Sequence, residues 1–319
     1  MPGLCGVVSR TEDLQRAMQL FRRVHAIAGV QFSETSYLAD ACLIANFGLG
    51  CLEGARVQPG RIAGSRSALM LEGEIYNSSE LSRKSSSDES AICRTLLKMY
   101  LDNGPDFVKD LDGEFNIVIY EADSGKLTIL NDHIASYPLY FCERSDGFLF
   151  GSEKKALLTV AHEGRDIDPV GLLQLFMHQH NLQDRTFMKG IKRLPPASKL
   201  TFKDGRVLVS TFNEIALDVQ DTANANDLLE EWRDKLEVAT AKRIRNKDRL
   251  LFSLSAGLDS RAVACSIDRN SRPIWARTAG KADSYEVRYA KEIAERLGFG
   301  HIIENPSDHV YSDAVHKVV

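Results

Sequence analysis

Residues 252–267 read FSLSAGLDSRAVACSI, which predicts a short apolar strand, a tight loop of small residues and the first turns of a helix. Ser255, Gly257, Asp259 and Ser260 stand in this loop. Small residues let backbone N–H groups approach a ligand closely, and a helix start adds partial positive charge, so the loop suits a phosphate group. Asp259 would repel a bare phosphate, and a Mg²⁺ ion bridging carboxylate and phosphate oxygens would account for it. On spacing alone, an ordinary strand–helix turn with a serine cap remains the alternative.

The sequence around this loop alternates between strands and helices. PIWART and HII read as two further strands, and SYEVRYAKEIAERLGFGH reads as an amphipathic helix that ends at Gly298. Upstream, a helical stripe is predicted from Leu228, Leu229, Trp232, Leu236 and Ala239. Strand–helix alternation with short connections predicts a parallel α/β sheet. The polar segment DVQDTANAND, which precedes this part, is the expected linker.

The first two thirds of the chain have the pattern of antiparallel hairpins. Apolar or alternating runs such as FNIVIYEADSGKLTILND and SKLTFKDGRVLVSTF are interrupted by Ser124-Gly125, Asp146-Gly147 and Asp204-Gly205. Helices are expected over DESAICRTLLKMYLDNG, from a cap at Asp88 to a stop at Gly104, and over DPVGLLQLFMHQH.

Composition excludes several classes of protein. The 319 residues carry a net charge of −4, and no basic field indicates a nucleic-acid partner. No run approaches the roughly 20 apolar residues of a membrane span, and the N-terminus lacks the pattern of a signal peptide. The six cysteines form no CxxC pair, which favours reduced thiols and a cytoplasmic location.

Several ordered motifs give the chain a family resemblance. LSAGLDSR resembles the SGGxDS loop of the ATP-pyrophosphatase superfamily. GEIYNSSEL, LDGEFNIVIYEADSGKLTILNDHIASYPLYF, FGSEKKALL and IKRLPPASKL resemble segments of the asparagine synthetase (glutamine-hydrolysing) family. The resemblance implies an α/β chain with an N-terminal-nucleophile (Ntn) αββα glutaminase-like domain over residues 1–214. Residues 215–319 would form the first part of a parallel-sheet, Rossmann-like ATP-pyrophosphatase domain.

The resemblance also implies a reaction and its ligands. A small-molecule or peptide carboxylate would be adenylated with ATP and Mg²⁺, and an amine would then displace AMP. Ser255, Gly257, Asp259 and Ser260 would hold the pyrophosphate end of ATP, with Asp259 also a Mg²⁺ ligand. Ala256 departs from the family glycine, at a cost of roughly 1 kcal/mol if that position needs a positive φ.

The glutaminase half departs from the family at its expected site. The family nucleophile is an N-terminal cysteine in Cys-Gly-Ile/Val, whereas Cys5 follows four residues, so its nitrogen is an amide that cannot act as the base. Glu72 replaces the asparagine that donates to the oxyanion, and a carboxylate there is repulsive. Gly73, Glu74 and Asp88 match positions that bind glutamine. The expectation is an inactive glutaminase half in which Cys5 is a small buried hydrophobe.

Several functions stay open at this stage. The chain ends at Val319, before the family's second aspartate motif and its catalytic lysine; Lys281 and Lys291 are the nearest basic candidates. A trimmed chain, a homodimer or a partner chain that supplies the rest would account for this. The candidates are an asparagine synthetase, a β-lactam synthetase or lasso-peptide-type macrolactam cyclase, and a non-catalytic relative. The acidic composition disfavours a fourth, a tRNA-modifying relative.

Overall fold

The computed structural model describes residues 3–26, 32–39, 41–48, 58–85, 92–161, 166–215, 224–245, 247–269 and 272–305. The chain forms two compact units, Met1–Ala216 and Leu217–Val319. Within the described ranges, no helix has the length and hydrophobicity needed to cross a bilayer. Each unit has its own hydrophobic core, and each is described by itself.

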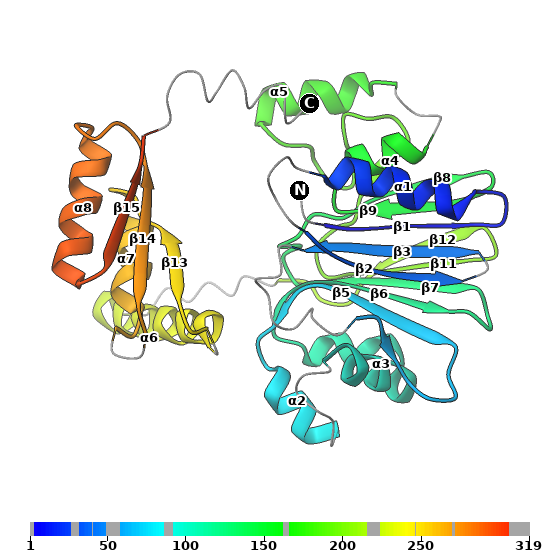
Figure 1. Cartoon of the computed structure of the whole chain (residues 1–319), viewed down its shortest axis with the longest axis horizontal. Coiled ribbons are helices and arrows are strands. Elements are labelled where there is room, and N and C mark those ends of the chain that lie inside the picture. Colours follow the sequence, from blue (N-terminus) through cyan, green and yellow to red (C-terminus); the bar gives the residue numbers. More distant parts are fainter. Residues whose placement is uncertain are drawn as a thin grey trace. The chain divides into compact units, whose positions relative to one another are not determined.

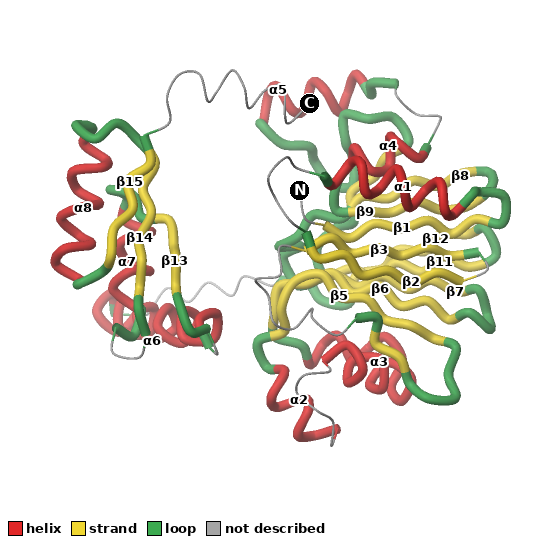
Figure 2. Tube along the Cα trace, in the orientation of Figure 1, coloured by secondary structure: helices red, strands yellow, loops and turns green. Residues whose placement is uncertain are grey.

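Unit 1 is built on two antiparallel six-stranded sheets (Figures 1 and 2). The first has the order β10-β8-β9-β1-β3-β2 and consists of β1 (Gly3–Ser9), β2 (Ser33–Ala39), β3 (Cys42–Gly48), β8 (Tyr140–Arg144), β9 (Gly147–Gly151) and β10 (Ile191–Arg193). The second has the order β12-β11-β7-β6-β5-β4 and consists of β4 (Gly60–Arg61), β5 (Ser67–Ile75), β6 (Gly113–Glu121), β7 (Lys126–Asn131), β11 (Ser198–Lys203) and β12 (Arg206–Thr211).

The predicted hairpins are confirmed by the strand pairing. β6 pairs with β7 around Gly125, which has a φ of 64°, and β11 pairs with β12 around Asp204 and Gly205, whose φ values are 51° and 73°. Positive φ at both central residues is what a type I′ two-residue turn requires, and Asp204-Gly205 meets this requirement. The third turn is displaced by one residue, because Gly147 already pairs with Arg144 as the first residue of β9.

Helices cover the outer faces of the two sheets and complete the predicted αββα arrangement (Figure 1). On the first sheet, α1 (Leu14–His25) and α4 (Lys154–Val160) pack against the apolar side chains of β1 and β9. On the second sheet, α3 (Ile92–Asn103) and the following 3₁₀ helix (Gly104–Asp110) do the same. Two further helices are α2 (Ser78–Ser85) and α5 (Pro169–His178). Asp88, the predicted cap, lies outside the described residues.

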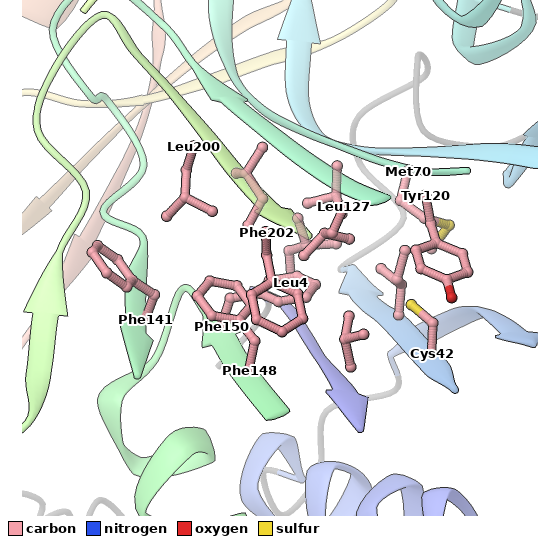
Figure 3. Packing of buried hydrophobic residues seen from close by; sticks show 14 of the residues in the cluster. Leu4, Cys42, Met70, Tyr120, Leu127, Phe141, Phe148, Phe150, Leu200 and Phe202 are labelled. Carbon is pink, nitrogen blue, oxygen red and sulfur yellow. The ribbon is translucent and has the colours of Figure 1, made fainter. Parts of the chain in front are cut away.

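The space between the sheets is filled by large apolar side chains (Figure 3). Phe148 of β9 stacks on Phe202 of β11, with ring centroids 5.0 Å apart, so the aromatic contact joins one sheet to the other. Because side chains alternate along a strand, Leu4 and Val8 of β1 face this inter-sheet core, while Cys5 and Val7 face the helices α1 and α4. This alternation decides what the residues at the start of β1 can reach.

Unit 2 contains a parallel three-stranded sheet in the order β13-β14-β15, which confirms the prediction for this part. Its elements are α6 (Ala225–Ile244), β13 (Leu250–Ser253), α7 (Leu258–Ser266), β14 (Ile274–Ala279), α8 (Tyr285–Leu297) and β15 (Gly300–Glu304). The predicted face of α8 is buried, and Gly298 caps the helix with a φ of 73°. The first part of the predicted α6 stripe is exposed, with Leu229 63% and Trp232 54% accessible, whereas Leu236 and Ala239 are half-buried.

Candidate functional site

The loop between β13 and α7 is closed by hydrogen bonds between its own small residues. Ser255 Oγ lies 2.9 Å from Ser260 Oγ and accepts a hydrogen bond from the Gly257 amide at 3.1 Å. Ser260 Oγ in turn accepts from the Ser255 amide at 3.2 Å. Three of the four residues predicted to form the site are therefore brought together, and their hydroxyl and amide groups share one small volume.

The N-terminus of α7 has no side-chain cap, a feature that it shares with α4 and with the 3₁₀ helix Gly104–Asp110. Asp13, Asp168, Asn224 and Ser284 cap α1, α5, α6 and α8 with their side chains. Gly257, at the N-cap of α7, makes no such bond. The first-turn amides of α7 therefore have no side-chain acceptor among the described residues, and they provide donors and partial positive charge for an anion.

Asp259 and Arg261 lie on the first turn of α7, beside these amides. Asp259 is exposed and makes none of the side-chain hydrogen bonds or ion pairs found within the described residues. Arg261 Nε donates to the Gly257 carbonyl at 3.2 Å and so folds back over the loop. Ala256 is not among the described residues with positive φ, so its methyl group causes no backbone strain there.

Two residues that the sequence did not single out support the base of this loop. Thr278 Oγ1 of β14 donates to the carbonyl of Leu254, the residue before the loop, at 2.7 Å. It also lies 2.9 Å from His301 Nε2 of β15. Burial, together with the positive charge of Lys291, lowers the pKa of His301, which favours the neutral ring. Lys291, one of the two basic candidates, is 60% exposed, and its Nζ lies 3.9 Å from Glu295 Oε1 on the same helix.

In unit 1, Gly73 occupies a position that only glycine fits. Its φ is +100°, and a Cβ there would lie 2.0 Å from the Glu114 carbonyl oxygen on the paired strand β6. The turn of the backbone places Glu74 beyond it in a half-buried position. Asp88, the third residue expected to bind glutamine, lies outside the described residues.

Glu72 stands at the centre of a buried polar cluster between the two sheets. Ser152 Oγ, just after β9, lies 2.8 and 2.6 Å from the two carboxylate oxygens, and Asn116 Nδ2 of β6 donates to one of them at 2.8 Å. The Leu4 amide of β1 donates to the same Ser152 hydroxyl at 3.1 Å. The cluster thus ties β1 and β9 of one sheet to β5 and β6 of the other.

The charge of Glu72 has no cationic partner among the described residues. The side chain is only 9% exposed. Burial raises the pKa of the Glu72 carboxyl, although the hydrogen bonds from Ser152 and Asn116 oppose this effect. Removing a carboxylate from water without a counter-ion is costly, which is the physical cause of the raised pKa.

Cys5 is positioned as a core residue. It is 0% exposed in the middle of β1, and its side chain packs among those of Ala17, Phe21 and Leu157 on the helix-facing side. Burial, and secondarily the nearby negative charge of Glu72, hold the pKa of the Cys5 thiol well above its usual range. A thiol in such surroundings is a poor nucleophile, because the reactive species is the thiolate.

Within the described ranges, no group of three or more His, Cys, Asp or Glu side chains is arranged to hold a metal ion. A Mg²⁺ ion needs no such group when substrate phosphates supply most of its ligands, since one or two carboxylates then suffice. Asp259 is the carboxylate that stands at the loop, and the fit to Mg²⁺ rests on that residue.

Comparison with known proteins follows the two-unit division. Residues 1–213 match the family model of the glutamine amidotransferase domain, and residues 231–319 match that of asparagine synthase. The chain is 27% identical over 207 residues to asparagine synthetase [glutamine-hydrolyzing] 3 of Bacillus subtilis, covering 63% of this chain and 33% of that protein. It is 24% identical over 326 residues to a probable asparagine synthetase of Dictyostelium discoideum, covering 92% and 53%.

The chain thus spans between a third and about half the length of these relatives. Among solved structures, that of the allosteric regulatory enzyme of purine biosynthesis is similar with a TM-score of 0.50 and 10% identity, covering 95% of this chain and 80% of that one. At this identity the likeness concerns the fold alone. Because the matched domain models occur in this order along the sequence, the chain belongs to the asparagine synthetase family and carries an N-terminal glutamine amidotransferase domain.

Proposed function

We propose that this chain is the nucleotide-binding part of an ATP-dependent, amide-forming ligase of the asparagine synthetase type, with a glutaminase half that does not hydrolyse glutamine. The observation that carries the first part is the loop at 255–260. Ser255, Ser260 and the Gly257 amide share one small volume beside the uncapped start of α7. In the loop these groups bond to one another, while the first turn of α7 has no side-chain cap, so a phosphate chain would be received by the α7 amides and by hydroxyls that exchange their mutual hydrogen bonds for bonds to its oxygens.

The proposed reaction proceeds in two steps. A substrate carboxylate oxygen attacks the α-phosphorus of ATP, the α–β anhydride bond breaks and pyrophosphate leaves. An amine nitrogen then attacks the acyl carbon, the bond to AMP breaks and the nitrogen loses a proton. The serine hydroxyls and the α7 amides would hold the departing pyrophosphate, and Asp259 would hold the Mg²⁺ ion that neutralises its charge.

The second part of the proposal rests on the direction of the Cys5 side chain. A nucleophile that acts together with residues 72–74 must reach the inter-sheet space, whereas Cys5 faces α1 and α4. The Cys-Gly-Ile motif can also be aligned three residues earlier, with Pro2-Gly3-Leu4. Gly3 then matches the motif glycine, and Leu4 takes the position of the isoleucine. In that register Gly3 lies against Ser152, where a Cβ would come within 3.3 Å of its side chain, and proline replaces the nucleophile. Pro2 itself lies outside the described residues.

The Glu72 cluster bears on the source of the amine. A carboxylate held by Ser152 and Asn116 occupies the position of the oxyanion donor, so ammonia from glutamine is disfavoured as the nucleophile. This favours an amine that the substrate itself brings, as in β-lactam or macrolactam formation, over one released in unit 1. In this proposal the carboxylate belongs to a small molecule or a peptide, and a partner chain can supply the rest of the synthetase domain.

Nucleotide binding tests the first part. Isothermal titration of the full chain with ATP, with and without MgCl₂, is compared with titration by AMP. We expect Asp259→Ala to weaken Mg-ATP binding by about tenfold or more and to leave AMP binding unchanged. Asp234→Ala, an exposed acid on α6, is the matched control. Equal losses for ATP and AMP would mean that the substitution disrupts the loop, and unchanged Mg-ATP binding would refute the role of Asp259.

A glutamate-release assay tests the second part. The full chain, Cys5→Ala and Glu72→Asn should all release no glutamate from glutamine above background. Asparagine at position 72 supplies the oxyanion donor that the family resemblance expects. It supplies no thiol on the side of β1 that faces the inter-sheet space, so glutamine hydrolysis should stay absent. Hydrolysis by the unmodified chain that is abolished by Cys5→Ala would overturn the proposal.

A further inference from the structure

A hollow of about 330 Å³ opens at one edge of unit 1, where the edge strands of the two sheets meet. Tyr37 of β2 forms one wall, Arg61 of β4 another, and Ser65, Arg66 and Ser67 of the β4–β5 turn line its mouth. This volume is near the lower end of the range for small-molecule sites. Ser67 begins β5 and Glu72 lies five residues along the same strand, roughly 17 Å away, so the hollow is separate from the Glu72 cluster.

The lining is basic. The eight residues that form it include two arginines and no carboxylate. Arg61 forms no ion pair within the described part of the chain; its guanidinium lies 5.1 Å from the centroid of the Tyr37 ring. Stacking on an aromatic face fixes the plane of a guanidinium and leaves its N–H groups free to bind an oxyanion with two parallel hydrogen bonds.

The second arginine, Arg66, takes part in an exposed ion pair. Arg66 pairs with Asp123 at 3.2 Å, but the two side chains are 65% and 72% exposed, and such surface pairs contribute little. An incoming anion would compete with Asp123 for the Arg66 guanidinium.

The turn also presents hydroxyl groups in a fixed arrangement. Ser65 Oγ accepts a hydrogen bond from the Ser67 amide at 3.1 Å, so its own proton is directed elsewhere. Tyr37 Oη donates to the Arg66 carbonyl, which anchors the turn to the buried wall of the hollow. The turn is shaped by Gly64, with a φ of +81°. Two arginines and the Ser65 hydroxyl thus belong to residues that line one hollow.

We propose that this hollow binds a small molecule bearing a doubly charged oxyanion, and that a phosphate monoester is the chemical class it takes. The proposal is independent of the nucleotide loop, which belongs to unit 2. Arg61 would bind two phosphate oxygens and Arg66 a third, while the Ser65 hydroxyl donates from the turn. A dicarboxylate offers a similar charge but not three oxygens on one centre.

Isothermal titration of the full chain tests this with three probes: inorganic phosphate, glycerol 3-phosphate and succinate. We expect glycerol 3-phosphate to bind, and Arg61→Ala to weaken it about tenfold or more. Arg61→Lys keeps the charge but not the fork and should recover only part of the loss. Arg206→Ala, an exposed arginine on β12, should change nothing. Ser260→Ala in unit 2 should leave in place the binding that Arg61→Ala removes, which separates this site from the nucleotide loop.

Failure would be recognisable in each arm. Absence of binding by both phosphate compounds at 10 mM, or binding that Arg61→Ala leaves unchanged while its circular dichroism spectrum and thermal midpoint match the unmodified chain, would overturn the site. Loss of glycerol 3-phosphate binding in Ser260→Ala would assign the phosphate to unit 2. Binding of succinate in preference to the phosphate compounds would overturn the phosphate class.

Discussion

Replacing Glu72 with glutamine should make unit 1 less sensitive to rising pH. Burial raises the pKa of this carboxyl in the folded chain above its unfolded value. Between the two values the folded chain binds more protons than the unfolded chain, so its free energy of unfolding falls as pH rises. The stabilisation is complete below the unfolded pKa, about 4.3, and is lost as pH rises through the folded one. One proton gives a slope of at most about 1.4 kcal/mol per pH unit, and Glu72→Gln removes it.

The hydrogen bonds of the cluster set the difference at low pH. Glutamine keeps an acceptor for Ser152 Oγ, but its amide nitrogen then faces Asn116 Nδ2, a second donor. Asn116 Oδ1 is buried and has no hydrogen-bond partner in the described part of the chain. A flip of the Asn116 amide supplies this oxygen to the new N–H group and gives up the longer 3.3 Å hydrogen bond from Nδ2 to the Tyr137 carbonyl. We therefore expect Glu72→Gln to lie within about 1 kcal/mol of the unmodified chain near pH 4.5 and to become increasingly more stable above it.

Urea unfolding between pH 4.5 and 8, followed by far-ultraviolet circular dichroism, measures this difference. Trp232 and Trp275 are the two tryptophans of the sequence, and both belong to unit 2, so their fluorescence reports that unit as an internal control. Glu143→Gln, at an exposed position on β8, is the matched substitution. A difference between Glu72→Gln and the unmodified chain that stays constant over this pH range would refute the reasoning, as would a matching shift in the fluorescence transition.

Three further predictions concern the backbone and the buried polar groups. Gly73→Ala should lower the stability of unit 1 by roughly 3 kcal/mol in urea unfolding, because its Cβ meets a carbonyl oxygen, whereas Gly64→Ala, with open space around it, should cost only about 1 kcal/mol. Gln179→Gly should stabilise unit 1 by up to about 1 kcal/mol, since Gln179 ends α5 with a φ of 60°, and Gly298→Ala at the equivalent cap of α8 should have the opposite sign for unit 2. Asp132→Asn should cost about 2–3 kcal/mol in thermal or urea unfolding, because Asp132 is 1% exposed and its oxygens accept three backbone amides and a hydroxyl; an unchanged midpoint would contradict this.

Local sequence signals predicted the parts of the fold that local chemistry determines. Asp204-Gly205 identified a hairpin because a tight turn needs residues that tolerate positive φ. The loop at 255–260 was predicted to connect a strand to a helix, because its small residues lie between a short apolar run and the start of a helical pattern. The stripe on α6 was identified as apolar, but periodicity says only which face is apolar, not whether anything covers it.

The contacts of the candidate sites needed tertiary structure. Glu72 and Ser152 are 80 residues apart and meet because β5 and β9 face each other across the core. Cys5 was considered a nucleophile because Cys-Gly-Val resembles a motif, yet β1 is apolar on both faces, so its sequence carries no alternation that could distinguish them. Thr278 and His301 likewise meet only through the order of the parallel strands.

The direction of each side chain along the strands decides which residue of β1 could act as a nucleophile in the inter-sheet space. In β3, β5 and β6, the residue two positions from an apolar core residue on the same face is polar: Ile44 and Asn46, Met70 and Glu72, Val118 and Asn116. The same spacing leads from Phe150 of β9 to Ser152, just after that strand. The polar layer lies at one end of the sandwich, on the same face as Leu4 of β1. Two positions before Leu4 the sequence has Pro2, whereas Cys5 falls on the opposite face. A thiol at position 5 therefore cannot join this layer without reversing the register of β1. We accordingly expect substitutions of Cys5 to change the packing of α1 against the first sheet rather than any chemistry at Glu72.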